Sequence, residues 1–364
     1  MDIFRILGVI LVLRLCYVAA DFVLTYLRPS RLSRYLPQQQ QRAKHGDPVP
    51  PSDQQTWAFI TGASGGIGRG FADALAARGF SIVLHGRDAA RLERARGELQ
   101  ARHPTRGFRV IVADAEYLVR CLPAQPPAHQ PSSPGVVAGI ETGTLQDSFA
   151  ALARSVADLD LRVLVNNAGG TPARRPYGAL DEYTADELAG NIGLLAVFPA
   201  LLAAALLPLL GRGGRLPALI INVGSLADNG APLLPAYAPC KAYLATWSVA
   251  LAREMRMRRE EAEGEGWRGG GGDVEVLGLR VGEVCGTASN IPGPSFLVPD
   301  VETLVAAALA RVGCGRKVVI PYWPHALPDT LVRFLLPEPV VDALYCSSMR
   351  QRRDEWRASA AKEK

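Results

Sequence analysis

Short apolar runs alternate with helical patterns along most of this chain, and no other feature constrains the fold as strongly. Each run is three to six residues long, and helical spacing of apolar residues follows most of them. Buried strands joined by helices form a parallel sheet, because each crossover lays a helix on a sheet face. The sequence therefore predicts an α/β fold with a doubly wound parallel sheet. The seven predicted strands are residues 58–61, 81–85, 108–112, 163–165, 219–223, 274–279 and 318–320.

Three stretches without hydrophobic periodicity divide the chain. Residues 28–54 are first basic and then rich in Gln and Pro, so we expect a linker there. Residues 118–143 are rich in Pro and Ala and residues 264–272 are largely Gly, which predicts two flexible surface insertions. A translated intron is the alternative for the first insertion. We expect one folded domain over residues 55–325 and a C-terminal tail over residues 326–364.

Residues 1–27 contain an apolar segment that is long enough for a helix to cross the roughly 30 Å hydrocarbon layer of a bilayer. Fifteen Leu, Ile, Val and Phe residues favour insertion, whereas Arg14 and Asp21 oppose it. The balance predicts a membrane anchor, and a helix lying on the membrane or on the protein is the alternative. A cleaved signal peptide is disfavoured, because the segment is too long and lacks a small-residue cleavage pattern.

Charge and cysteine usage argue against a nucleic-acid-binding, disulfide-stabilised or metal-binding protein. The formal net charge is +5, and much of the basic excess lies in residues 28–44, which contain no acidic residue. This local stripe favours a cytoplasmic position for the following chain and does not indicate a nucleic-acid-binding domain. The six cysteines lack CxxC spacing and the five histidines form no cluster. We therefore expect no disulfide framework, no metal site and a reducing compartment.

A glycine-rich turn follows the first predicted strand. Its glycines let the backbone turn sharply and approach a pyrophosphate, which would meet free N–H groups at the start of the next helix. A plain strand-to-helix turn is the alternative, but the order of strand, turn and helix favours a dinucleotide site. The candidate cofactor residues in this turn are Thr61, Gly62, Ser64, Gly66, Ile67 and Gly68.

Residues after the second and third predicted strands refine the choice of cofactor. Arg87 stands where an acidic residue would bond a ribose diol, and a guanidinium there can bind a 2′-phosphate. Arg87 therefore favours NADP(H) over NAD(H), with a solvated surface arginine as the alternative. Asp114 could accept a hydrogen bond from the adenine amino group, and capping of the next helix is its alternative role.

Tyr237 and Lys241 are the strongest candidates for chemistry. Residues four apart on a helix share a face, so the ammonium can lie beside the phenol. A nearby cation lowers the pKa of a phenol from about 10, which would suit proton transfer near neutrality. Pro239 lies between the two residues and is tolerated only in a first helical turn.

In this order on these elements, the residues resemble the short-chain dehydrogenase/reductase family over about residues 57–287. The resemblance implies a Rossmann fold in which residues 61–68 form the cofactor loop. Residues 166–169 would support the adenosine side of the cofactor, with Asn166, Ala168 and Gly169 as the candidate contacts. Thr287 would touch the nicotinamide amide, although the segment before it lacks the Pro-Gly pair that is usual in the family.

The resemblance also implies a catalytic tetrad of Asn191, Ser225, Tyr237 and Lys241. Tyr237 would transfer the proton and Ser225 would hydrogen-bond the substrate carbonyl. Lys241 would hold the nicotinamide ribose, and Asn191 would hold a water that relays protons to Lys241. Taken alone, Asn191 could instead cap or kink a helix, and Ser225 could be an ordinary loop hydroxyl.

Three features are similar to those of the membrane-bound 17β-hydroxysteroid dehydrogenase and very-long-chain 3-oxoacyl-CoA reductase subgroup: the N-terminal apolar segment, residues 191–210 with Pro208, and residues 322–325. This resemblance implies an endoplasmic reticulum membrane protein whose active site faces the cytosol. Its reaction would be NADP(H)-dependent reduction of an apolar substrate, with 3-oxoacyl-CoA in fatty-acid elongation preferred. A steroid, retinoid or secondary-metabolite ketone is an alternative, as is a non-catalytic NADP(H)-binding membrane scaffold. Residues 191–210 are apolar nearly all round, which predicts a buried helix and leaves a homodimer interface open.

Overall fold

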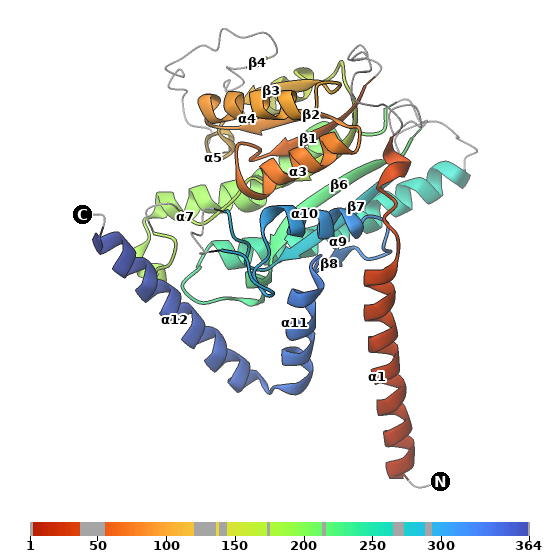
Figure 1. Ribbon diagram of the computed structural model, residues 1–364, viewed down its shortest axis with the longest axis vertical. Coiled ribbons are helices and arrows are strands. Elements are labelled where there is room, and N and C mark those ends of the chain that lie inside the picture. Colours follow the sequence, from red (N-terminus) through yellow and green to blue (C-terminus); the bar gives the residue numbers. More distant parts are fainter. Residues whose placement is uncertain are drawn as a thin grey trace.

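A parallel eight-stranded sheet forms the centre of the molecule, with strand order β4-β3-β2-β1-β5-β6-β7-β8 (Figure 1). The computed structural model describes residues 3–36, 55–119, 136–137, 144–172, 175–212, 216–264, 273–287 and 293–362. The strands are β1 (Thr56–Thr61), β2 (Ser81–Gly86), β3 (Phe108–Val112), β4 (Val136–Val137), β5 (Asp160–Asn166), β6 (Ala218–Ser225), β7 (Val274–Val281) and β8 (Val318–Val319). The predicted doubly wound parallel sheet and its seven strands are confirmed.

The eighth strand, β4, lies inside the stretch that was expected to be a flexible insertion. It pairs with β3 at the edge of the sheet, where Val110 faces Val136 and Ile111 faces Val137. Two β-branched residues are enough to extend a sheet edge even where the flanking sequence shows no periodicity. Residues 120–135 and 138–143 of this stretch lie outside the described residues, as do residues 265–272 of the second expected insertion.

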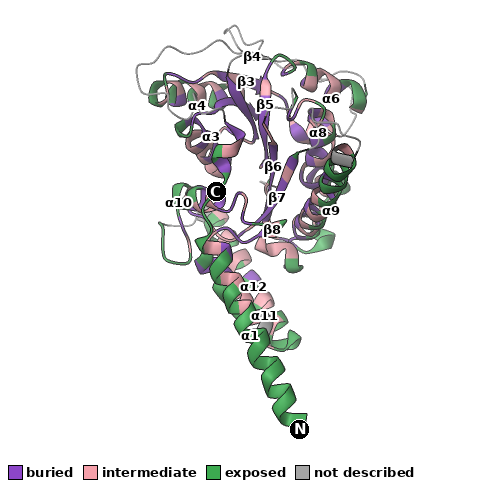
Figure 2. Ribbon diagram, turned by 90° about the vertical axis from the view of Figure 1, so that its right-hand side faces the viewer, coloured by how far each residue is buried: buried purple, intermediate pink, exposed green. Residues whose placement is uncertain are grey.

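Helices cover both faces of the sheet (Figure 2). Apolar side chains of α3, α4 and α10 pack on one face, and those of α6, α8 and α9 pack on the other. These crossover helices are α3 (Gly66–Ala77), α4 (Ala89–Arg102), α6 (Leu145–Arg154), α8 (Phe198–Leu206), α9 (Tyr237–Gly264) and α10 (Val301–Ala310). The other helical elements are α1 (Ile3–Leu27), η1 (Leu32–Tyr35), α5 (Ala115–Leu118), η3 (Leu180–Glu182), α7 (Ala185–Ile192), η4 (Gly193–Val197), η5 (Leu226–Asn229), α11 (Trp323–Leu335) and α12 (Glu338–Lys362).

One face of the apolar stretch 191–210 packs on the core, whereas Ile192 and Val197 are exposed, so the predicted burial all round is confirmed only in part; its helix also begins earlier. The helix starts after Thr184, whose hydroxyl accepts a hydrogen bond from the Glu187 backbone N–H while the Glu187 carboxylate accepts one from the Thr184 N–H. It continues from α7 through the π-turn η4 into α8, which ends before Pro208. Phe198, Leu202 and Leu206 are fully buried, so core packing accounts for the apolarity of this face.

Residues 28–36 differ from the expected linker because they pack on the domain. The Ser30 hydroxyl donates to the Leu309 carbonyl at 2.6 Å, and Tyr35 is fully buried with its hydroxyl donating to the Glu275 carboxylate at 2.6 Å. Arg34 pairs with the same carboxylate, so part of the basic stripe has an acidic partner that lies far away in the sequence. Residues 37–54 lie outside the described residues.

Helix α1 occupies the predicted segment and projects from one end of the domain (Figures 1 and 2). Its most apolar 18-residue window has no buried residue, and length and composition would allow it to cross a membrane. Only its last turns contact the domain: Asp21 pairs with Arg316, and the Tyr26 hydroxyl donates to the Ile320 carbonyl at 2.5 Å. The ion pair neutralises one of the two charges that oppose insertion, and Arg14 stays exposed.

Candidate active site

The glycine loop, residues 61–68, connects β1 to α3 at the carboxyl edge of the sheet. Gly62 has φ +66 and Gly66 has φ +53, a backbone region in which side chains are strained. A Cβ atom at Gly68 would lie 2.3 Å from the Gly62 carbonyl oxygen, so the loop can fold against α3 only with glycine there. Ser64 is half-buried in the turn, and Ile67 packs on the core from the first turn of α3.

The end of β5 holds this loop in place. The Thr61 hydroxyl accepts hydrogen bonds from the backbone N–H groups of Asn167 and Ala168, each at 2.8 Å. The Asn167 side-chain amide donates to the Thr61 carbonyl at 2.9 Å. Asn167, which lies in the predicted cofactor segment 166–169, therefore supports the loop directly.

Asn166 points the other way, into the molecule. Its side-chain amide donates to Asn222 at 2.9 Å, and the Asn222 amide donates to the Ser248 hydroxyl at 2.9 Å. Successive side chains of a strand point to opposite faces, which explains why two neighbouring asparagines have different roles. That alternation at the end of a predicted strand distinguishes Asn167 from Asn166 within the segment 166–169.

Two arginines lie on the adenosine side of the glycine loop. Arg87 is exposed directly after β2, where the sequence analysis expects a cation for the 2′-phosphate. Arg91, in the first turn of α4, reaches the loop, because a Cβ atom at Gly65 would lie 2.9 Å from its Nη2 atom. The sequence analysis missed Arg91, although its spacing of four residues from Arg87 was visible. Asp114 caps α5 by accepting from the Glu116 N–H at 2.9 Å, which is its alternative role.

The proton-transfer candidates meet at the start of α9. The helix begins at Tyr237, so Pro239 falls in the first turn, as predicted. Lys241 is 5% exposed, and its ammonium donates to the Val223 carbonyl at 2.8 Å. The ammonium nitrogen lies 5.5 Å from the centroid of the Tyr237 ring. A Cβ atom at Gly169 would lie 3.7 Å from the same nitrogen, so the segment after β5 also borders Lys241.

Ser225 combines the two roles that the sequence left open. It ends β6 and caps η5, where its hydroxyl accepts from the Ala227 backbone N–H at 3.2 Å. The same side chain is hydrogen-bonded to Tyr237. The cap fixes the position of the hydroxyl, and the hydroxyl then lies beside the phenol.

Burial dominates the electrostatics of this pair. It raises the pKa of Tyr237 above 10, and the hydrogen bond with Ser225 only partly opposes this increase. The expected lowering of the phenol pKa by Lys241 is therefore not what the structure shows. Burial also lowers the pKa of Lys241 to about 8. At neutral pH the phenol is protonated and can act as an acid. Lys241 is still mostly protonated there and loses its proton near pH 8.

Asn191 and Thr287 complete the arrangement. Asn191 ends α7, where its side-chain amide donates to the Gly170 carbonyl at 2.9 Å and its buried Oδ1 atom has no hydrogen-bond partner. Such an atom is suited to accept from a water molecule. Thr287 lies against the glycine loop, because its side chain would be 3.8 Å from a Cβ atom added at Gly66. Its hydroxyl donates to the Val284 carbonyl at 2.9 Å.

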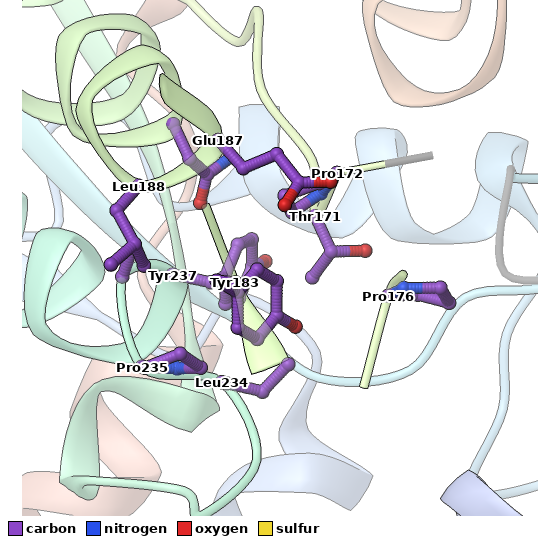
Figure 3. Close-up of a pocket in the computed structure, with 11 residues that line it drawn as sticks. Thr171, Pro172, Pro176, Tyr183, Glu187, Leu188, Leu234, Pro235 and Tyr237 are labelled. Carbon is purple, nitrogen blue, oxygen red and sulfur yellow. The ribbon is translucent and has the colours of Figure 1, made fainter. Parts of the chain in front are cut away.

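Asn191 and Tyr237 line one pocket (Figure 3). The other lining residues are mostly apolar and come from three segments of the chain. Glu187 and Tyr183 add polar atoms, and the Tyr183 hydroxyl donates to the Arg175 carbonyl at 2.9 Å. The remaining lining residues are Thr171, Pro172, Pro176, Leu188, Leu234, Pro235 and Ala236. The pocket thus offers an acid beside an apolar wall.

Comparisons with known proteins agree with this geometry. A family model described as short chain dehydrogenase matches residues 56–122. The chain is 27% identical over 283 residues to a very-long-chain 3-oxoacyl-CoA reductase of Pyricularia oryzae, covering 75% of this chain and 70% of that protein. A protein of the same name from Mycosarcoma maydis is 28% identical over 302 residues, covering 81% and 74%.

A solved structure shows the same fold. It is a short-chain dehydrogenase from Burkholderia cenocepacia in complex with NADP, with a TM-score of 0.52 and 20% sequence identity. The match covers 72% of this chain and 94% of that one.

Proposed function

The chain belongs to the short-chain dehydrogenase/reductase family, and from this premise we propose that it reduces a carbonyl group of an apolar substrate with NADPH. One observation carries the proposal: Tyr237, Ser225 and Lys241 converge, and Lys241 borders Gly169 in the segment that supports the glycine loop. The loop packs against the first turn of α3 with no room for a side chain at Gly68, so its backbone lies close to the N-terminus of that helix, where a pyrophosphate would bind. Arg87 and Arg91 add two guanidinium groups on the adenosine side, which fits a 2′-phosphate.

The residues of the chain divide the chemistry among them. When bound, the nicotinamide supplies the hydride. Tyr237 gives the proton to the carbonyl oxygen, and its raised pKa keeps the phenol protonated at neutral pH, which favours reduction. Ser225 orients the carbonyl by a hydrogen bond. Lys241 lies between Gly169 and Tyr237, where it can hold the nicotinamide ribose, and Asn191 holds a water that reprotonates the site.

The proposed substrate is a long-chain 3-oxoacyl-CoA, as in fatty-acid elongation. The names of the two fungal relatives and the mostly apolar pocket wall support this choice. Helix α1 would anchor the enzyme in the endoplasmic reticulum membrane with its domain toward the cytosol, close to a substrate that partitions into the bilayer. A steroid, retinoid or secondary-metabolite ketone is the second candidate, since the pocket is apolar around Tyr237.

The test is NADPH oxidation by detergent-solubilised full-length protein, with a long-chain 3-oxoacyl-CoA and a steroid ketone in parallel. Tyr237→Phe should reduce turnover by about a thousandfold, since general acid catalysis contributes about 10²–10⁴. NADPH binding should survive in that variant. Tyr183→Phe is the matched control, because it removes a hydroxyl from the same pocket that has no contact with Ser225 or Lys241.

Each outcome selects one candidate. Tyr237-dependent turnover of the acyl-CoA alone supports the elongation reaction, and turnover of the steroid alone supports the second candidate. Substantial activity of Tyr237→Phe would contradict the assigned acid. NADPH binding without turnover across a wider set of carbonyl compounds would instead favour a non-catalytic NADP(H)-binding membrane scaffold.

A further inference from the structure

The C-terminal helices leave the domain beside α1. The Ile320 carbonyl, directly after β8, accepts the hydrogen bond from Tyr26 near the end of α1, and α11 begins three residues later at Trp323. Both helices then project from the same end of the domain, and α12 turns back from the far end of α11 (Figures 1 and 2). Whatever medium surrounds the free part of α1 therefore lies next to α11.

Helix α11 has the reverse polarity of a helix on a water-soluble protein. Its outward stripe repeats every four residues and is apolar: Trp323 is 45% exposed, Leu327 42%, Leu331 46% and Leu335 64%. Two polar side chains of this helix that the structure describes, His325 and Asp329, face the domain instead. The His325 ring is hydrogen-bonded to the Leu297 carbonyl at 2.7 Å, and Asp329 pairs with Arg280 at 3.4 Å. Exposed leucines over buried polar groups indicate contact with an apolar phase.

The first turns of α12 extend this apolar surface. Val340 and Leu344 are four residues apart and are 43% and 52% exposed. Glu338 and Asp342 are also exposed on these turns, and their charges would keep the segment out of the middle of a bilayer. The surface thus has the composition of a helix at the boundary between headgroups and acyl chains.

We propose that the α11–α12 corner is a second membrane-contact element that dips into one leaflet beside α1. The corner consists of Leu327, Leu331, Leu335, Val340 and Leu344. Helix α11 is about 20 Å long at 1.5 Å per residue, so it reaches into one leaflet of a hydrocarbon layer that is roughly 30 Å thick and does not cross it. A burial depth of about 5–10 Å agrees with the charges of Glu338 and Asp342.

Contacts farther along α12 connect this corner to the pocket. Tyr345 accepts a hydrogen bond from Asn229 at 3.0 Å, and buried Met349 packs with Leu234 in the cluster that includes Tyr237. One helix therefore runs from the proposed bilayer contact to the pocket wall. The membrane contact itself does not depend on the reductase chemistry.

Fluorescence quenching in vesicles tests the contact with the full-length chain. An environment-sensitive fluorescent amino acid is introduced singly at Leu335, at Val12 in α1 or at Met257 in α9. These positions have matched exposures of 64%, 57% and 58%. Each protein is reconstituted into phosphatidylcholine vesicles with and without acyl-chain bromination, which quenches probes near the hydrocarbon. The same proteins are assayed for NADPH oxidation, so loss of the reductase function is read separately.

We expect the probes at Leu335 and Val12 to lose most of their fluorescence in brominated vesicles, while the probe at Met257 is unchanged. Bromines near the headgroup end of the chain should quench Leu335 better than those near the bilayer centre. An unquenched probe at Leu335 would overturn the proposal, whether or not Val12 is quenched. Equal quenching at Met257 would overturn it as well, because it would show general adsorption of the protein to the vesicle.

Discussion

The cofactor side and the substrate side of the site are held together in different ways. On the cofactor side, the contacts join the ends of two neighbouring strands, as when the Thr61 hydroxyl accepts from two backbone N–H groups after β5. On the substrate side, the contacts join α12 to the short helices η3 and η5 through side chains at the surface. Asn229 bonds Tyr345, 116 residues away, and Glu182 pairs with Arg357, 175 residues away.

This difference has a consequence for tolerance to change. Backbone contacts at Gly62 and Gly68 leave no space for an added atom, so the cofactor side is rigid. Exposed hydrogen bonds and ion pairs contribute little stability each, so the substrate side can shift without unfolding the domain. We therefore expect substitutions on the cofactor side to have large effects and those along α12 to have small, separable ones.

Gly68→Ala should give the largest effect on cofactor binding. The new Cβ would lie 2.3 Å from the Gly62 carbonyl oxygen and 2.5 Å from the Asn167 side-chain nitrogen, so the loop must move. Such overpacking costs about 1–3 kcal/mol, or about 5- to 150-fold in the NADPH dissociation constant, measured by titration calorimetry. Gly97→Ala in α4 is the control, because its Cβ meets nothing within 4 Å. An unchanged dissociation constant for Gly68→Ala would contradict the rigidity of this side.

The pH dependence of kcat/KM tests Lys241, which lies where the two sides meet. Its pKa of about 8 means that the ammonium form is present below that pH and is lost above it. If the charged form is required, kcat/KM for reduction falls by about tenfold per pH unit above about pH 8. Lys241→Arg should move this limb to higher pH, because a guanidinium keeps its charge. A flat profile to pH 9.5 in the unaltered enzyme would show that the Lys241 charge is not needed.

Arg87→Asp tests the choice of cofactor. The carboxylate would repel a 2′-phosphate and could bond a ribose diol, so the ratio of kcat/KM for NADPH to that for NADH should fall by about tenfold or more. Arg94→Asp makes the same charge change at an exposed position of α4 and should leave the ratio unchanged. A ratio unchanged by Arg87→Asp would show that Arg87 does not bind the 2′-phosphate.

Local spacing explains which parts of the site could be predicted from the sequence. The glycine turn, Tyr237 and Lys241 each lie within one element or one turn, so their juxtaposition follows from the geometry of a strand end or a helix face. The sheet was predicted for the same reason, because each buried strand shows its own apolar run. The predicted lowering of the Tyr237 pKa was wrong, because the cost of burying the phenol depends on neighbours that the motif does not contain.

Long-range contacts explain what the sequence did not show. Residues 28–36 have no hydrophobic period, yet Tyr35 is buried because Glu275 in β7 supplies a partner for its hydroxyl. The sequence of α11 shows the pattern of an ordinary amphipathic helix and does not indicate which face is buried. Only the fold shows that Asp329 faces inward toward Arg280. The side that a helix presents to the domain is set by distant residues, and a single sequence does not reveal it.

The smallest effect should come from Tyr345→Phe, and it would sharpen the contrast most. The change removes the oxygen that accepts from Asn229 at 3.0 Å and leaves the ring in place. A net hydrogen bond contributes about 0.5–1.5 kcal/mol, and this exposed one should give only about a two- to threefold rise in KM for the carbonyl substrate. The NADPH dissociation constant should stay unchanged.

Gln351→Ala is the control, because its hydrogen bond to Glu355 at 2.8 Å stays within α12. A parallel rise in the NADPH dissociation constant would mean that α12 braces both sides of the site, and the division between them would have to be abandoned.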